Sequence, residues 1–91
     1  MPSYVYIIYS ERLNYYYKGY TEDIIRRITD HNTGRNVSTA NKGPWKVVFV
    51  RSYLTKNEAL REERRLKRTN SSYIRWLIEQ DFNELKKIFP H

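Results

Sequence analysis

Two short runs of β-branched and aromatic residues near the N-terminus constrain the fold more than any other feature of the sequence. Residues 4–9 read Tyr-Val-Tyr-Ile-Ile-Tyr, and residues 15–20 read Tyr-Tyr-Tyr-Lys-Gly-Tyr. Such residues favour extended backbone, and the polar stretch between the two runs favours a turn, so the pattern predicts a β-hairpin. Because successive side chains of a strand point to opposite faces, the hairpin can bring Tyr6 and Tyr17 side by side.

The segments that follow carry the signals of two helices and one more strand. We expect a helix that is capped by Thr21, with acidic residues in its first turn, and that stops at Gly34. After a polar loop, residues 45–50 read Trp-Lys-Val-Val-Phe-Val and predict a third strand. The spacing of Thr55 and Glu58 is that of a capping box, which predicts a second helix.

The C-terminal part of the chain is predicted to be helical. The second helix is expected to end near Arg68, after which Asn70 caps a third helix, and Asp81 is a candidate cap for a last short one. The apolar residues expected to face inward from this last segment are Phe82, Leu85 and Phe89. The order β-β-α-β-α-α predicts an α+β fold, with a small three-stranded antiparallel or mixed sheet flanked by helices. Residues 1–91 are expected to form a single domain.

The balance of charge favours a polyanionic partner. The chain carries 17 Lys and Arg against 10 Asp and Glu, which gives a formal net charge of +7. Neutralisation of phosphates releases counterions and supplies affinity, so nucleic acid is the expected partner. A solvated basic surface is the alternative, and charge alone leaves it open.

Residue types that are rare or missing exclude several chemistries. The absence of Cys excludes disulfides, Cys-ligated zinc and thiol nucleophiles. With only His31 and His91, metal sites built from several His are excluded as well. The longest apolar run, residues 5–9, is far too short to span a bilayer, so we expect a cytoplasmic protein with no membrane partner.

Glu63 departs most clearly from the pattern of its helix. At about 100° per residue, the second predicted helix places Ala59, Leu60, Glu63 and Leu66 on one face. A carboxylate on an apolar stripe is costly unless it pairs with a cation or binds a metal ion. A buried ion pair with an Arg and a metal site are two open interpretations of equal weight.

Arg27 and His31 form the second departure. They are spaced i and i+4, so they are neighbours along the edge of the Ile stripe of the first predicted helix. An Arg beside a His offers a fixed cation for a phosphate and a titratable donor next to it. A solvated flank is the commoner origin of such a pair. Arg26 points further outward, to a backbone phosphate or to solvent.

In their order and spacing these residues resemble the signature of the GIY-YIG nuclease superfamily. Residues 4–6, Tyr-Val-Tyr, are similar to its first triplet, and residues 17–19, Tyr-Lys-Gly, to its second. Tyr replaces the first Gly, and Lys replaces the middle Ile. The segments 21–31 and 59–67 are similar to those of small stand-alone bacterial members. The resemblance covers roughly residues 3–75 and extends to the N-terminal nuclease domain of the excision-repair incision subunit.

The resemblance implies a phosphodiester hydrolase that uses one divalent metal ion, Mg²⁺ or Mn²⁺. It implies that Tyr6 is the general base for the attacking water and that Tyr17 orients water or phosphate. Arg27 would stabilise charge on the phosphate, and His31 would assist proton transfer. Glu63 would hold the metal ion, which keeps most of its waters and needs few protein oxygens. We expect these residues to line one cleft on the same side of the sheet.

The expected substrate is nucleic acid, and more narrowly DNA that is cut during repair or processing. Basic residues around the implied site would contact its backbone. These are Lys18, Arg26, Arg64, Arg65 and Lys67. The alternative interpretation is a non-catalytic nucleic-acid-binding module with the same fold.

Overall fold

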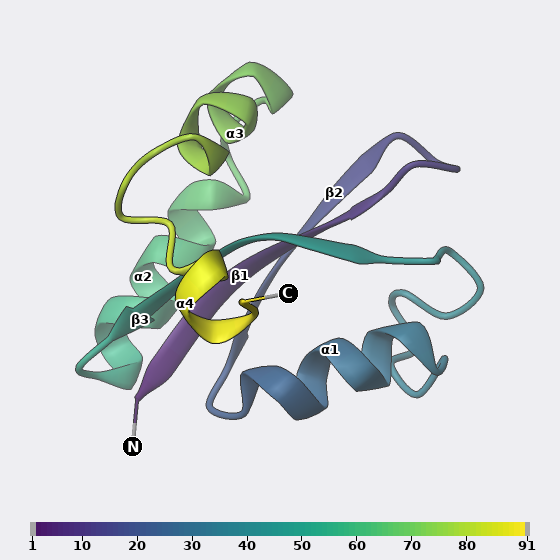
Figure 1. Cartoon of the computed structure of the whole chain (residues 1–91), viewed down its shortest axis with the longest axis horizontal. Coiled ribbons are helices and arrows are strands. Elements are labelled where there is room, and N and C mark those ends of the chain that lie inside the picture. The colour runs from purple at the N-terminus through teal and green to yellow at the C-terminus, as the bar shows by residue number, and fades with distance from the viewer. Residues whose placement is uncertain (1, 91) are drawn as a thin grey trace.

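The computed structural model describes residues 2–90 and is built around a three-stranded sheet (Figure 1). The strands are β1 (Ser3–Ser10), β2 (Tyr15–Thr21) and β3 (Lys46–Tyr53). β1 lies in the middle and pairs antiparallel with both neighbours, in the order β2-β1-β3. The predicted α+β fold is confirmed, and the sheet is antiparallel throughout rather than mixed.

Helices cover both faces of this sheet. Within residues 2–90 they are α1 (Ile24–Asn32), α2 (Lys56–Leu66), α3 (Ser71–Ile78) and α4 (Leu85–Ile88). The buried side chains of α2 and α3 pack on one face, whereas those of α1 and α4 pack on the other. Figure 1 shows α1 and α2 on opposite sides of the strands. The molecule therefore has three layers, with the sheet in the middle. None of these helices has the length and hydropathy needed to cross a bilayer.

Side-chain alternation along β1 builds the core on both faces. Val5 and Ile7 face α2 and α3, whereas Tyr6 and Ile8 face α1 and α4. All four side chains are at most 1% exposed. The central strand is therefore buried on both faces, and Tyr6 lies in the layer of α1.

Local capping signals of the sequence are confirmed at three helix ends. Thr55 accepts a hydrogen bond from the backbone N–H of Glu58 at the start of α2, and Asn70 caps α3 in the same way. After α1, Gly34 has a φ of +77°, the left-handed conformation that ends many helices.

The start of α1 differs from the prediction. Thr21 is the last residue of β2, and the cap is Asp23, whose carboxylate accepts a hydrogen bond from the backbone N–H of Arg26. The Thr21 hydroxyl instead accepts a hydrogen bond from the backbone N–H of Asp23, at 3.0 Å. Thr and Asp both cap helices well, and the turn that uses Thr21 moves the start of α1 downstream. The acidic residues therefore precede the first turn.

The last helix also starts later than predicted, because the turn before it is anchored to β3. The N-cap position of α4 is Glu84 rather than Asp81. The Glu84 carboxylate accepts hydrogen bonds from the backbone N–H and the hydroxyl of Ser52, at 2.7 and 2.8 Å. Phe82 was expected to face inward, but it is 36% exposed, and the Arg51 guanidinium lies over its ring.

Candidate active site

The two tyrosines of the implied site lie on the α1 face of the sheet. Tyr6 pairs with Gly19 across the hairpin, and Tyr17 pairs with Ile8. Gly19 leaves room for the Tyr6 ring, since a Cβ atom at this position would collide with it. A glycine inside a strand often marks such a close approach, and here the approaching group is the Tyr6 phenol.

His31 contacts both tyrosines from α1. Its side chain is buried, and its Nε2 lies 2.6 Å from the hydroxyl oxygen of Tyr6. Its ring centroid lies 5.1 Å from that of Tyr17. On the other side, its Nδ1 lies 2.7 Å from the Oγ1 of Thr39. Tyr6, His31 and Thr39 thus form a buried hydrogen-bonded triad.

The protonation state of His31 fixes the direction of these hydrogen bonds. Burial, together with the nearby charge of Arg27, lowers the pKa of His31 to about 4. The imidazole is therefore neutral at neutral pH and carries one N–H. Among residues 2–90 the Tyr6 hydroxyl has no acceptor other than Nε2 of His31, so the phenol donates to Nε2. The single N–H of the ring is then at Nδ1, where it donates to the Thr39 hydroxyl.

Tyr6 keeps its proton at neutral pH in this environment. Burial raises the pKa of Tyr6 most; the neighbouring Tyr17 and the charge of Glu63 raise it further, whereas Arg27 lowers it. A phenol that acts as a base here must give up its own proton while it accepts another. The Nε2 of His31 is already in position to receive that proton.

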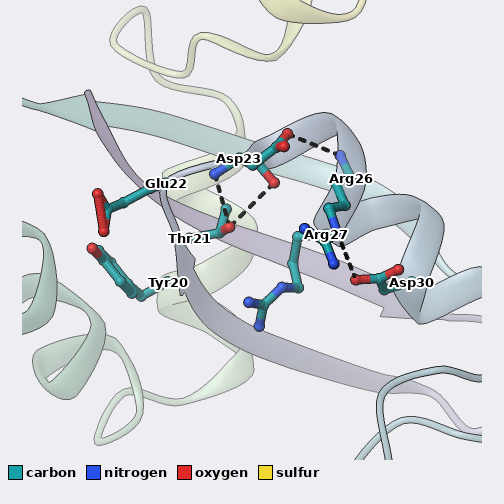
Figure 2. A pocket seen from close by; sticks show the side chains of 7 residues that line it. All are labelled: Tyr20, Thr21, Glu22, Asp23, Arg26, Arg27 and Asp30. Carbon is teal, nitrogen blue, oxygen red and sulfur yellow. Dashed lines mark hydrogen bonds and ion pairs between the residues drawn. The ribbon is translucent and has the colours of Figure 1, made fainter. Parts of the chain in front are cut away.

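Arg27 extends from α1 into a cavity of about 490 Å³ (Figure 2). The residues that line this cavity are Tyr20, Thr21, Glu22, Asp23, Arg26, Arg27 and Asp30. Arg26 reaches Asp30 at 3.9 Å, whereas Arg27 has no ion-pair partner among residues 2–90. Arg27 also lowers the pKa of Tyr6, so its guanidinium lies within electrostatic reach of the triad as well as in the cavity wall.

Glu63 approaches from the opposite layer. It belongs to α2, whose buried residues pack on the face of the sheet away from Tyr6. The backbone of α2 thus lies in another layer than α1, and a single cleft shared by all implied site residues stays a prediction for Glu63. Its charge nevertheless acts on Tyr6, which lies against Gly19 of the edge strand β2.

The carboxylate of Glu63 is only loosely engaged within the protein. Its side chain is 16% exposed, and it lies 3.6 Å from the Nζ of Lys67, which is 55% exposed. The Arg partner considered from the sequence belongs instead to the adjacent Glu62, which binds Arg65 through two hydrogen bonds of 2.6 and 2.7 Å. Among the described residues, the carboxylate oxygens of Glu63 accept no hydrogen bond and remain available to a ligand.

These properties fit a hard divalent cation with few protein ligands. Within residues 2–90, no group of three or more His, Asp or Glu side chains is arranged to hold a metal ion. A site of that kind is not required, because Mg²⁺ commonly keeps several waters and takes one or two carboxylates plus substrate phosphate oxygens. Glu63 would supply the carboxylate.

The predicted nucleic-acid contacts differ in how free their charges are. Arg64 is exposed and unpaired among the described residues, whereas Arg65 is held by Glu62 and by the hydroxyl of Tyr73. Lys18 is half-buried on β2, and burial lowers its pKa. Arg26 and Lys67 each lie in a loose ion pair.

Thr39 is the site residue that sequence reasoning missed. It lies in the segment 35–44, which has no periodic pattern and was expected only to be a polar loop. It reaches His31 because the loop folds back over α1, where its backbone carbonyl also accepts a hydrogen bond from the indole N–H of Trp45. No local feature of the sequence marks that contact.

Comparison with known proteins identifies related chains. Residues 2–76 match the family model described as the GIY-YIG catalytic domain. The chain is 30% identical over 77 residues to the UPF0213 protein YazA of Bacillus subtilis (strain 168), which covers 84% of this chain and 78% of YazA. It is 38% identical over 52 residues to the UPF0213 protein OB0043 of Oceanobacillus iheyensis, which covers 56% of this chain and 60% of that protein.

A solved structure supports the same assignment. The solution NMR structure of the UPF0213 protein BH0048 from Bacillus halodurans matches this chain with a TM-score of 0.58 and 29% identity, over 98% of this chain and 95% of that one. The arrangement of sheet and helices is thus shared with a solved UPF0213 protein. Together, the match of the catalytic-domain model and these relatives place the chain in the GIY-YIG family, alongside the UPF0213 proteins.

Proposed function

We propose that this protein is a metal-dependent endonuclease that hydrolyses phosphodiester bonds of DNA in repair or processing. The observation that carries the proposal is the buried Tyr6–His31–Thr39 triad next to Arg27, an arrangement suited to proton transfer beside a phosphate. Membership of the GIY-YIG family and the net charge of +7 support it.

In the proposed reaction, Arg27 binds the scissile phosphate and offsets the charge that develops on it. The Tyr17 hydroxyl makes no hydrogen bond within residues 2–90, so it is free to orient the attacking water or a phosphate oxygen. Glu63 would hold one Mg²⁺ or Mn²⁺ ion, which supplies Lewis-acid stabilisation of the phosphate when bound.

The proton follows the hydrogen bonds of the triad. The attacking water gives a proton to the Tyr6 oxygen as its own oxygen bonds to phosphorus, and the Tyr6 proton passes to the Nε2 of His31. The bond from phosphorus to the leaving oxygen breaks, and that oxygen takes up a proton from solvent. The imidazolium that forms keeps its Nδ1–H hydrogen bond to Thr39. The negative phosphate offsets the charge of Arg27, which otherwise opposes protonation of His31.

A non-catalytic nucleic-acid-binding module is the second candidate. It is favoured by the burial of Tyr6, which is 1% exposed and whose pKa is raised by that burial. In this alternative the triad stabilises the fold, and the basic residues bind the backbone.

A plasmid-nicking assay with added Mg²⁺ or Mn²⁺ separates the two candidates. Wild type should nick supercoiled DNA, and Tyr6→Phe should abolish nicking because it removes the hydroxyl and keeps the ring. The substitution leaves the buried His31 Nε2 unpaired, at a cost of about 1–3 kcal/mol, so folding is checked by a thermal melt. Tyr4→Phe is the control, because Tyr4 is partly buried on the same face of β1. Full activity of Tyr6→Phe would refute the proton path, and wild type inert in every metal would leave the binding module.

A further inference from the structure

A second hollow has Tyr17 of the candidate active site in its wall. We call this hollow, which has a volume of about 390 Å³, the aromatic pocket. The residues that line it are Leu13, Tyr15, Tyr17, Ser38, Lys42 and Trp45. Tyr15 is 51% exposed and Leu13 is 44% exposed. Large apolar side chains grouped around a concave surface are a common feature of ligand sites.

The wall of this pocket is rigid. The backbone N–H of Trp45 donates to the side-chain oxygen of Asn32 at 2.8 Å, and the amide of Asn32 donates back to the Trp45 carbonyl at 3.1 Å. The indole N–H donates to the Thr39 carbonyl at 3.2 Å. The ring is thus fixed by its polar groups, and Thr39 contacts both the pocket wall and His31.

The pocket and the candidate active site have Tyr17 in common. The ring centroids of Tyr15 and Trp45 lie 6.5 Å apart, and those of Tyr17 and Trp45 lie 6.2 Å apart. Tyr17 then lies 5.1 Å from His31 by the same measure. The rings of Trp45 and Tyr17 would therefore connect a ligand on Tyr15 with His31 of the triad.

The surroundings of the pocket carry positive charge. Lys42 forms part of its wall. Trp45 also lines a neighbouring hollow, whose wall adds the cations Arg12 and Lys46 and one carboxylate, Glu11. Aromatic rings flanked by Lys and Arg are the combination that binds single-stranded nucleic acid, where the rings stack on bases and the cations pair with phosphates.

We propose that the aromatic pocket binds an unpaired DNA base that flanks the phosphate held at the candidate active site. The proposal rests on the proposed function for the position of that phosphate. A base inside a duplex is covered on both faces by its neighbours, so a base that stacks on Tyr15 must first leave the stack. Stacking uses the π-face that all bases share, and the pocket therefore selects unpaired nucleotides rather than a sequence.

The test is a binding measurement in EDTA, in which no metal-dependent cleavage takes place. Fluorescence anisotropy of a labelled short oligothymidylate is compared with that of an oligomer of abasic nucleotides of the same length and charge. Tyr15→Ala should weaken oligothymidylate binding by about 5- to 150-fold, the range expected for one stacked base, and should leave abasic binding within about twofold. Wild type should prefer oligothymidylate over the abasic oligomer, a comparison that needs no variant.

Two control variants separate stacking from other effects. Tyr15→Phe keeps the ring and should bind within about twofold of wild type. Trp76→Ala removes an aromatic side chain of similar exposure, 52%, on α3, and should also leave binding unchanged. Unchanged oligothymidylate binding by Tyr15→Ala, or an equal loss with the abasic oligomer, would overturn the proposal.

The nicking assay distinguishes failure of this inference from failure of the proposed function. Base-dependent loss in Tyr15→Ala together with inert wild type would support the pocket and reject the nuclease. Active wild type together with unchanged binding by Tyr15→Ala would reject the pocket and keep the nuclease.

Discussion

Replacing Glu63 by Gln removes one negative charge and keeps the shape of the side chain. The substitution breaks the ion pair with Lys67, which is 3.6 Å long and whose cation is 55% exposed. Such a pair contributes about 0.2–1 kcal/mol, well below the roughly 3–5 kcal/mol expected when a buried ion pair is broken. For a domain of this size, the melting temperature should therefore fall by no more than about 4–8 °C.

The effect on cleavage should be much larger than the effect on stability. A neutral amide is a poor ligand for a hard cation, and loss of a direct ligand should cost at least as much as the roughly 10- to 100-fold loss caused by outer-shell changes. Nicking should fall by about 100-fold or more. DNA binding in EDTA should be kept or strengthened, because a negative charge near the phosphate is gone.

Glu62→Gln is the matched control, because Glu62 is the neighbouring carboxylate and is 20% exposed. It breaks the paired hydrogen bonds to Arg65, so it should destabilise the fold at least as much as Glu63→Gln and still nick DNA. The assays are a thermal melt and plasmid nicking on both variants. Nicking at the wild-type rate by Glu63→Gln, or an equal loss of nicking in both variants, would refute the assignment of the metal to Glu63.

Three other predictions rest on the same site and its surroundings. Thr39→Val removes the acceptor of the His31 Nδ1–H, so nicking should fall and its pH profile should shift, whereas Thr39→Ser should restore both; identical profiles for the two variants would contradict a positioning role. The pKa of His31 is lowered from 6.5 to about 4, so between these values the unfolded chain binds a proton that the folded chain does not. The free energy of unfolding should therefore decrease as pH falls from about 6.5, by roughly 3 kcal/mol at pH 4, and urea melts of His31→Gln should lack this component. A plot of the logarithm of DNA affinity against the logarithm of salt concentration should have a slope of about −0.7 to −0.9 per phosphate neutralised. Charge reversal at Arg64 and Arg65 should weaken binding to all sequences alike. An affinity that does not change with salt would contradict the inference from net charge to a nucleic-acid partner.

Local chemistry was sufficient to predict most secondary structure and the residues that depart from it. Alternation in 4–9 and 15–20 predicts the hairpin, because extended backbone sends successive side chains to opposite faces. The caps Thr55 and Asn70 follow from side chains that accept hydrogen bonds from backbone N–H groups a turn away. Glu63 can be recognised in the same way as a carboxylate on an apolar face of its helix, because the helical period is a property of the backbone.

What the tertiary structure decided are the contacts between distant segments. The sequence places Glu63 on an apolar face, but only packing determines that α2 lies in the layer opposite Tyr6. Packing likewise determines that Glu63 forms an ion pair with Lys67, whereas Arg65 forms one with Glu62. These outcomes depend on rotamers and on helix placement, which no periodicity encodes.

The triad shows the same division within one site. Tyr6 and His31 are recognisable in the sequence, because each lies at a regular position of a strand or a helix. Thr39 lies in an irregular loop, and its contact with His31 exists only after that loop closes over α1. Loop conformation is set by hydrogen bonds and packing with the rest of the fold rather than by a local repeat. The sequence therefore determined which side chains could transfer a proton, and the fold determined which of them are hydrogen-bonded to one another.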